Sequence, residues 1–307
     1  MKVTEVGQVL LLLLLICPPG SAQEADSTGF SSAREVGGVH LLRADRGPTF
    51  DNVTVSIGPD GTLLIDAAYA ETADSLLVSI QRAGGTRPRI LVNTHFHHAG
   101  GNDVLGRGAL IIGHGNARQR MQQASRMYGM MPIGPWADSA LPKIVVDSAL
   151  SLYFNGEEIR LIHFPGGHTD GDLVVFFTGS RVVATGDLYV PLLGPCDLAN
   201  GCRWNDYVAA IRRLVTLVPR HAVIFPGHGP ASTPAELREF ETILKDVTTM
   251  VGRSIQKGRT REQIIAEGLP RRYAGWAGRG IPADFFLGNA YTVSTPARAG
   301  SASPPWW

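Results

Sequence analysis

The sequence is poor in cysteine and has few charged residues, and this composition excludes several classes of protein. Cysteine accounts for 3 of its 307 residues, which excludes a small scaffold held by many disulfides. Charged residues make up 18% and the formal net charge is +1. No basic stripe or acidic tail stands out, so we do not expect nucleic acid as a partner. Hydrophobic residues reach 44%, which is enough for a sizeable core and argues against wholesale disorder.

Long hydrophobic runs are scarce as well. The run Val9 to Ile16 (VLLLLLLI) is too short to cross a bilayer, so stable membrane insertion is not expected. Small residues follow it up to Ala22, and the pattern predicts a secretory signal peptide over residues 1–22, cleaved after Ala22. We therefore expect a secreted or periplasmic protein. Two other interpretations are a buried core strand and a lipid anchor on Cys17, although Ile16 is not the small residue that normally precedes such a cysteine.

Removal of the signal peptide would leave two cysteines, Cys196 and Cys202. An even number of cysteines in an exported protein permits a disulfide, and this pair would close a small loop. The alternative is two thiols that stay reduced. We favour the disulfide.

Hydrophobic periodicity and turn residues predict hairpins first, and then strands that alternate with helices. Alternating residues at 52–57 and 62–65 flank one turn, and Asn155-Gly156 marks a second hairpin between 150–154 and 159–164. The remaining elements are strands at 89–92, 109–112, 173–177, 182–184 and 222–225, helices at 71–82, 116–127, 206–218 and 235–251, and a loop at 130–142. This order indicates an α/β (α+β) protein with two mixed β-sheets and helices outside them, rather than one parallel sheet.

Histidines and one aspartate follow the ends of four predicted strands. The stretch after the predicted strand at 89–92 (NTHFHHAGGND, 93–103) holds three of the nine histidines. The candidate metal ligands at the four strand ends are His95, His97, His98, His168, Asp187 and His228. His95 and His97 are two positions apart, so both point the same way in an extended segment. Rigid strand ends beside glycines suit a metal site. Imidazole and carboxylate ligands favour zinc, as one or two ions, with iron or manganese as alternatives if the site is redox-active.

The chain resembles the metallo-β-lactamase superfamily in five motifs that stand in the family's order: NTHFH (93–97), HAGGN (98–102), GHT (167–169), ATGD (184–187) and PGHG (226–229). The resemblance implies a four-layer αββα sandwich over residues 28–255, with the metal site at the edge between the sheets. Carried over motif by motif, His95, His97 and His168 would hold a first metal. Asp187 would bridge to a second metal, which His228 would also bind. Residues 256–307 are expected to form a partly irregular C-terminal extension.

One motif departs from the family's pattern. The family usually has H-x-H-x-D-H, whereas here His98 follows His97 directly, so the aspartate has no counterpart. The second metal would keep only His98, Asp187 and His228 from the protein, plus water, which zinc accepts at an open site. Consecutive residues of a strand point apart, so His98 reaches inward only if the chain turns after His97. We expect it to be a ligand; the alternative is a histidine at the rim or behind the ligands. Asp66 is expected to brace a loop near the metals.

These residues predict a metal-dependent hydrolase that acts on a small molecule. Hydroxide at the metal, with Asp187 and His98 as catalytic residues, would attack an ester, lactone, amide or lactam, or phosphodiester. A β-lactamase-type antibiotic hydrolase is one alternative; export favours it, but Asp187 stands where β-lactamases of this superfamily usually have cysteine or serine. Because the first motif is shortened, a non-hydrolytic metal-binding or one-metal redox protein is another alternative. The sequence does not indicate an oligomeric state.

Overall fold

The computed structural model describes residues 29–44, 51–194, 196–276 and 281–292. The expected signal peptide, residues 1–22, lies outside this part of the chain. Within the described ranges, none of the helices combines the length and the apolar character that a membrane span requires.

The first β-sheet has seven strands in the spatial order β1-β2-β3-β4-β5-β6-β9. Strands β1 to β4 are antiparallel neighbours, and β4, β5, β6 and β9 run parallel to one another. The sheet is therefore mixed, as predicted. Its strands are β1 (Phe30–Val36), β2 (Val39–Ala44), β3 (Asn52–Gly58), β4 (Gly61–Ile65), β5 (Ile90–Val92), β6 (Leu110–His114) and β9 (Ile144–Val146).

The second β-sheet has five strands that lie in sequence order from β10 to β14. They are antiparallel up to β13, whereas β13 and β14 are parallel, so this sheet is mixed too. Its strands are β10 (Ala149–Phe154), β11 (Glu157–Phe164), β12 (Asp172–Phe177), β13 (Val182–Gly186) and β14 (Val223–Pro226).

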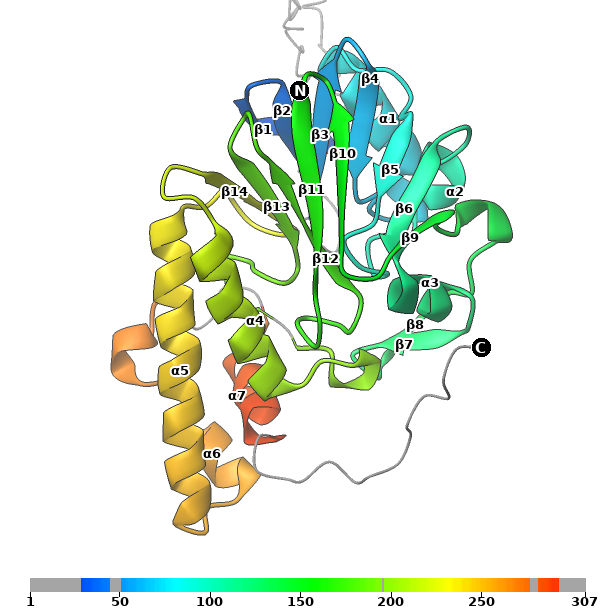
Figure 1. Cartoon of the computed structure of the whole chain (residues 1–307). Coiled ribbons are helices and arrows are strands. Elements are labelled where there is room, and N and C mark those ends of the chain that lie inside the picture. The colour runs from blue at the N-terminus through cyan, green and yellow to red at the C-terminus, as the bar shows by residue number, and fades with distance from the viewer. Residues whose placement is uncertain (1–28, 45–50, 195, 277–280, 293–307) are drawn as a thin grey trace, which may run out of the picture.

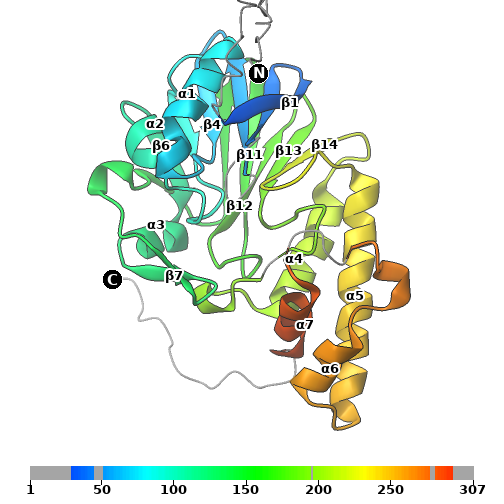
Figure 2. The same ribbon diagram turned by 180° about the vertical axis from the view of Figure 1, so that it is seen from behind.

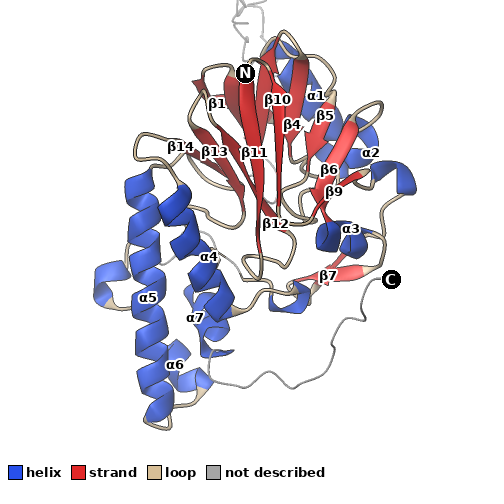
Figure 3. Cartoon of the chain, viewed as in Figure 1, coloured by secondary structure: helices blue, strands red, loops and turns tan. Residues whose placement is uncertain are grey.

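Helices cover the outer faces of both sheets (Figure 3). Figures 1 and 2 show α1 (Ala73–Arg82) and α2 (Asn102–Leu105) on one side, and α4 (Trp204–Leu217) and α5 (Pro234–Gln256) on the other. Between the sheets, Leu63 and Val92 of the first pack in one core with Val175 and Phe225 of the second. The predicted αββα sandwich is confirmed.

Local sequence explains why α5 forms where it does. The side chain of Thr233 accepts a hydrogen bond from the amide of Glu236, and the Glu236 carboxylate accepts one from the amide of Thr233, which is a capping box. Buried residues such as Leu237, Phe240 and Leu244 follow at spacings of three and four, so one face of the helix packs on the sheet.

Two predicted elements near the site were wrong. The helix expected at 116–127 ends earlier, as α3 (Gly115–Met121), and a small hairpin follows: β7 (Ser125–Met127) and β8 (Met131–Ile133), the second of which lies in the expected loop. The carbonyl of Met121 accepts a hydrogen bond from the amide of Trp136, and the carbonyl of Arg126 accepts one from the Asn200 side chain. These tertiary contacts take the backbone groups that a longer helix would have used.

The C-terminal residues that the structure describes pack on the second sheet's helices. Helices α6 (Arg261–Glu267) and α7 (Ala283–Tyr291) follow α5, which itself runs five residues past its expected end at 251. Phe286, Leu287 and Ala290 are fully buried in the same apolar core as Phe240 of α5. The described part of the extension therefore contributes to this core.

Candidate metal centre

The predicted ligand residues come from loops at one edge of the two sheets. The loop after β5 carries His95, His97 and His98, and the loops after β11, β13 and β14 carry His168, Asp187 and His228. All are at most 2% exposed except His228, whose side chain is 22% exposed. The sandwich thus brings together side chains from both sheets, and His228 lies on the more open side of the cluster.

One carboxylate oxygen lies at the centre of this cluster. Oδ2 of Asp187 is 3.2 Å from Nε2 of His228, 3.8 Å from those of His95 and His168, and 3.9 Å from that of His98. The neighbouring loop approaches it closely: a Cβ at Gly227 would lie 2.1 Å from Oδ1 of Asp187, so only glycine fits there.

His95, His97, His168 and Asp187 together offer ligand atoms that all lie within 4.8 Å of one another. Nδ1 of His97 and Nε2 of His168 are 3.0 Å apart. Ligand bonds of ~2.0–2.1 Å in a tetrahedral zinc site place neighbouring ligand atoms about 3.3 Å apart. Among the described residues, Nε2 of His95 and Oδ1 of Asp187 are buried without a hydrogen-bond partner. A divalent cation fits this geometry and would satisfy both atoms.

Asp66 and Thr94 hold the ring of His95 in place. The Asp66 carboxylate accepts hydrogen bonds from the amide of Thr94 at 2.8 Å and from its hydroxyl at 2.7 Å. The same hydroxyl is 3.0 Å from Nδ1 of His95, which leaves Nε2 of that ring facing Asp187. Asp66 therefore braces the histidine loop, as expected from its position after a strand.

His98 faces the cluster because the chain turns directly after His97. The backbone of His98 is hydrogen-bonded to Ala67, and the following glycines pack tightly on that segment. A Cβ at Gly101 would lie 2.2 Å from the carbonyl oxygen of Ala67, so the turn depends on glycine. The structure therefore places His98 inside the cluster.

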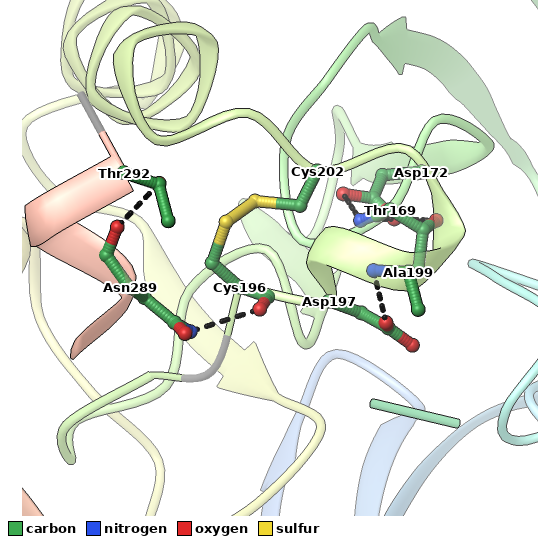
Figure 4. Close-up of a disulfide and its surroundings, with 8 residues drawn as sticks. All are labelled: Thr169, Asp172, Cys196, Asp197, Ala199, Cys202, Asn289 and Thr292. Carbon is green, nitrogen blue, oxygen red and sulfur yellow. Dashed lines mark hydrogen bonds between the residues drawn. A yellow bond between two sulfur atoms is a disulfide. The ribbon is translucent and has the colours of Figure 1, made fainter. Parts of the chain in front are cut away.

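Sequence reasoning missed Asp197, which orients the ring of His97. Its Oδ2 is 3.0 Å from Nε2 of His97 and also accepts hydrogen bonds from the amide of Tyr128 and the side chain of Asn200. The expected Cys196–Cys202 disulfide is present and lies next to it, as Figure 4 shows. Asp197 follows a cysteine in a loop that carries no motif of its own, so the sequence gave no signal that this aspartate orients His97.

Asp51 was also missed. Its carboxylate Oδ1 lies 3.8 Å from Nε2 of His98 and 3.4 Å from Nδ1 of His228, and the residue is 2% exposed. Asp51 stands directly before β3, far from every motif in the sequence. Nothing in its local sequence distinguishes it from a turn residue.

Burial and charge divide the histidines into two groups. Burial lowers the pKa of His95 well below its ordinary value and that of His97 to about 4, so both rings are neutral at physiological pH. Burial also disfavours the charged form of His98, but the carboxylates of Asp187, Asp51 and Asp66 outweigh it and raise the pKa to about 10. Burial opposes ionisation of Asp187, yet His228 and His98 hold its pKa well below the usual range.

Aromatic side chains flank the histidines on one side. The ring of Tyr128, on the hairpin between β7 and β8, lies 5.5 Å from that of His97 and 6.0 Å from that of His168. Phe285 of α7 packs edge-on against Tyr128 at 5.9 Å. At the tip of the same hairpin, Met130 is 58% exposed. The surface beside the cluster is therefore partly apolar.

The αββα sandwich carries a buried cluster of histidines and aspartates at one edge of its two sheets, and this cluster suits a divalent cation. Residues 46–228 match the model of the metallo-beta-lactamase superfamily, and the chain belongs to this superfamily. Over 80 residues it is 34% identical to a probable metallo-hydrolase of Streptococcus pyogenes serotype M6. This stretch is 26% of the chain and 34% of the relative, so the match spans about a third of that relative's length.

Solved structures of the same fold are more distant in sequence. A metallo-beta-lactamase from Pontibacter korlensis superposes with a TM-score of 0.58 at 18% identity, over 70% of this chain and 99% of that one. The inverting sec-alkylsulfatase Pisa1 from Pseudomonas sp. gives 0.62 at 19% identity, over 87% of this chain and 52% of that one. At these identities the likeness establishes the fold alone.

Proposed function

We propose that this protein is an exported, zinc-dependent hydrolase of a small ester, lactone, amide or lactam, or phosphodiester. The observation that carries the proposal is the single carboxylate oxygen of Asp187 with four imidazole nitrogens within 3.9 Å. Such a set of nitrogen and oxygen atoms suits zinc, with iron or manganese as the alternatives if the chemistry is oxidative.

His95, His97 and His168 would hold the cation together with Asp187. When bound, the cation lowers the pKa of a coordinated water and polarises the scissile group of the substrate. Thr94 and Asp197 keep the rings of His95 and His97 oriented toward it. The scheme needs no serine or cysteine nucleophile.

The open side of the cluster suggests how substrate approaches. His228 is the most exposed member, and Tyr128 with Phe285 forms an apolar wall beside His97 and His168. A substrate with one apolar part would contact this wall while its polar group faces His228. This arrangement favours a partly apolar substrate over a highly charged one.

His97→Ala tests the proposed function. The metal content of the protein as purified is measured by elemental analysis, and the zinc-loaded protein is then assayed on chromogenic esters, lactams and phosphodiesters. We expect hydrolysis of at least one class by the native protein, and loss of both turnover and metal in the variant. His221→Ala, which changes an exposed histidine, is the matched control. Full activity of His97→Ala would refute the assignment of His97 as a metal ligand. Iron in place of zinc in the purified protein would indicate a redox protein. Activity on lactams alone would favour an antibiotic hydrolase.

Export is proposed on two grounds, the apolar run before Ala22 and the disulfide. Disulfides persist mainly in oxidising compartments, so Cys196–Cys202 is consistent with a secreted or periplasmic protein. The mature protein isolated from its native host should begin at Gln23. A mature chain that still begins at Met1 would contradict the proposal.

A further inference from the structure

Beyond the four proposed ligands, the structure holds a second group of metal-binding atoms that shares Asp187. Asp51, His98 and His228 each offer an atom, and these atoms lie within 4.8 Å of one another. His98 and His228 also face Oδ2 of Asp187, at 3.9 and 3.2 Å. The two groups are thus adjacent, with one carboxylate between them.

The separations in this second group match a small divalent cation. Oδ1 of Asp51 is 3.8 Å from Nε2 of His98 and 3.4 Å from Nδ1 of His228. His228 faces Asp51 with Nδ1 and Asp187 with Nε2, and a ring binds one ion through only one of these nitrogens. With one atom from each residue, Asp51, His98 and His228 still lie within 4.8 Å of one another. Ligand atoms around a tetrahedral zinc ion lie about 3.3 Å apart, so the group would have to close around the ion. Within the group of Asp51, His98, His228 and Asp187, Asp51 supplies a second carboxylate beside that of Asp187.

The backbone fixes Asp51 in this position. Asp51 forms a β-bridge with His228, and the amide of Asn52 donates to the carbonyl of Gly227 at 2.8 Å. The Asn52 side chain donates to the carbonyls of Pro226 and Gly229 at 2.9 and 2.7 Å. The start of β3 is therefore clamped to the loop that carries His228, and the Asp51 carboxylate is preorganised relative to that ring.

We propose that Asp51 is a metal ligand, and that with His98, His228 and Asp187 it forms a second cation site. The inference rests on the proposed function, because it adds an ion beside the one held by His95, His97 and His168. In the linear sequence the histidine motif lacks its aspartate, and the fold brings in a carboxylate from the residue directly before β3 instead.

A simpler role for Asp51 would be to orient His228 by accepting a hydrogen bond from its Nδ1. Asp51→Asn separates the two roles, since the amide oxygen can still accept that hydrogen bond but carries no charge to bind a cation. Asp51→Asn and the native chain are dialysed against a zinc buffer, and the ions bound per chain are counted by elemental analysis. Asp74→Asn, at an exposed position of α1, is the matched control.

We expect two ions in the native protein and in Asp74→Asn, and one in Asp51→Asn. Two ions in Asp51→Asn would overturn the proposal and leave Asp51 as a residue that orients His228. One ion in the native protein would also overturn it, while leaving the proposed hydrolase intact. No ion in the native protein would refute the proposed function as well.

A second measurement does not depend on the variant's folding. In crystals of the zinc-loaded native chain, anomalous scattering at the zinc edge locates each ion directly. A peak ~2.0–2.2 Å from the Asp51 carboxylate supports the proposal, because that is the bonding distance of zinc to a carboxylate oxygen. Peaks that are all farther from Asp51 would overturn it.

Discussion

Replacing Asp197 by asparagine tests whether this buried carboxylate holds His97 in its ligand orientation. Oδ2 of Asp197 is 3.0 Å from Nε2 of His97, so the opposite nitrogen, Nδ1, faces His168. Asparagine has the same shape and can still accept one hydrogen bond, but it is neutral. The variant therefore removes the charge while it preserves the packing of the loop.

The expected loss follows from the kind of hydrogen bond that is weakened. A hydrogen bond to a charged group is worth ~1.5–3 kcal/mol and a neutral one ~0.5–1.5 kcal/mol. Carboxylates that support a metal-binding histidine typically contribute about 10–100-fold in metal affinity. We therefore expect Asp197→Asn to weaken binding of the first ion by roughly 10–100-fold, or ~1.4–2.8 kcal/mol.

Competition with a chromophoric zinc chelator measures this affinity, and circular dichroism checks that the variant is folded. The control is Asp246→Asn, because Asp246 accepts a hydrogen bond from Arg272 at 2.7 Å on α5 and touches none of the proposed ligands. The reasoning would be refuted if Asp197→Asn bound zinc within twofold of the native protein.

Three further predictions concern the loop, the pH response and the C-terminal helices. Replacing Cys196 and Cys202 with serine should lower the free energy of unfolding in urea by about 2 kcal/mol, from loss of loop closure; an unchanged midpoint would contradict this. The carboxylates around His98 raise its pKa to about 10, so this ring carries a proton that must leave before a cation binds. In calorimetric titrations from pH 6.5 to 8.5, binding of the second ion should therefore strengthen by about tenfold with each unit of increasing pH. A flat profile would argue against His98 as a ligand. Phe286→Ala should cost about 3–5 kcal/mol in the same urea assay, since the ring is fully buried; a loss below 1 kcal/mol would show that α7 adds little to the core.

Much of the fold could be read along the chain. The hairpin around Asn155-Gly156 and the strands that end at Val92 and Phe225 carry local signals, because turn residues and side-chain alternation act over a few positions. The helix after His114 was overestimated, since contacts from Trp136 and Asn200, distant in sequence, end it at Met121. Local propensity cannot register such contacts.

The candidate site divides in the same way. His95, His97, His168, Asp187 and His228 lie in glycine-bordered motifs at strand ends, so their gathering at one sheet edge could be anticipated from the sequence. The positions of Asp51 and Asp197 beside the histidines could not, because neither aspartate belongs to a motif. The closure of the two sheets brings Asp51 beside His228, and the disulfide-bonded loop brings Asp197 beside His97. Which carboxylates face the histidines therefore depends on distances across the sandwich, which spacing along the chain does not encode.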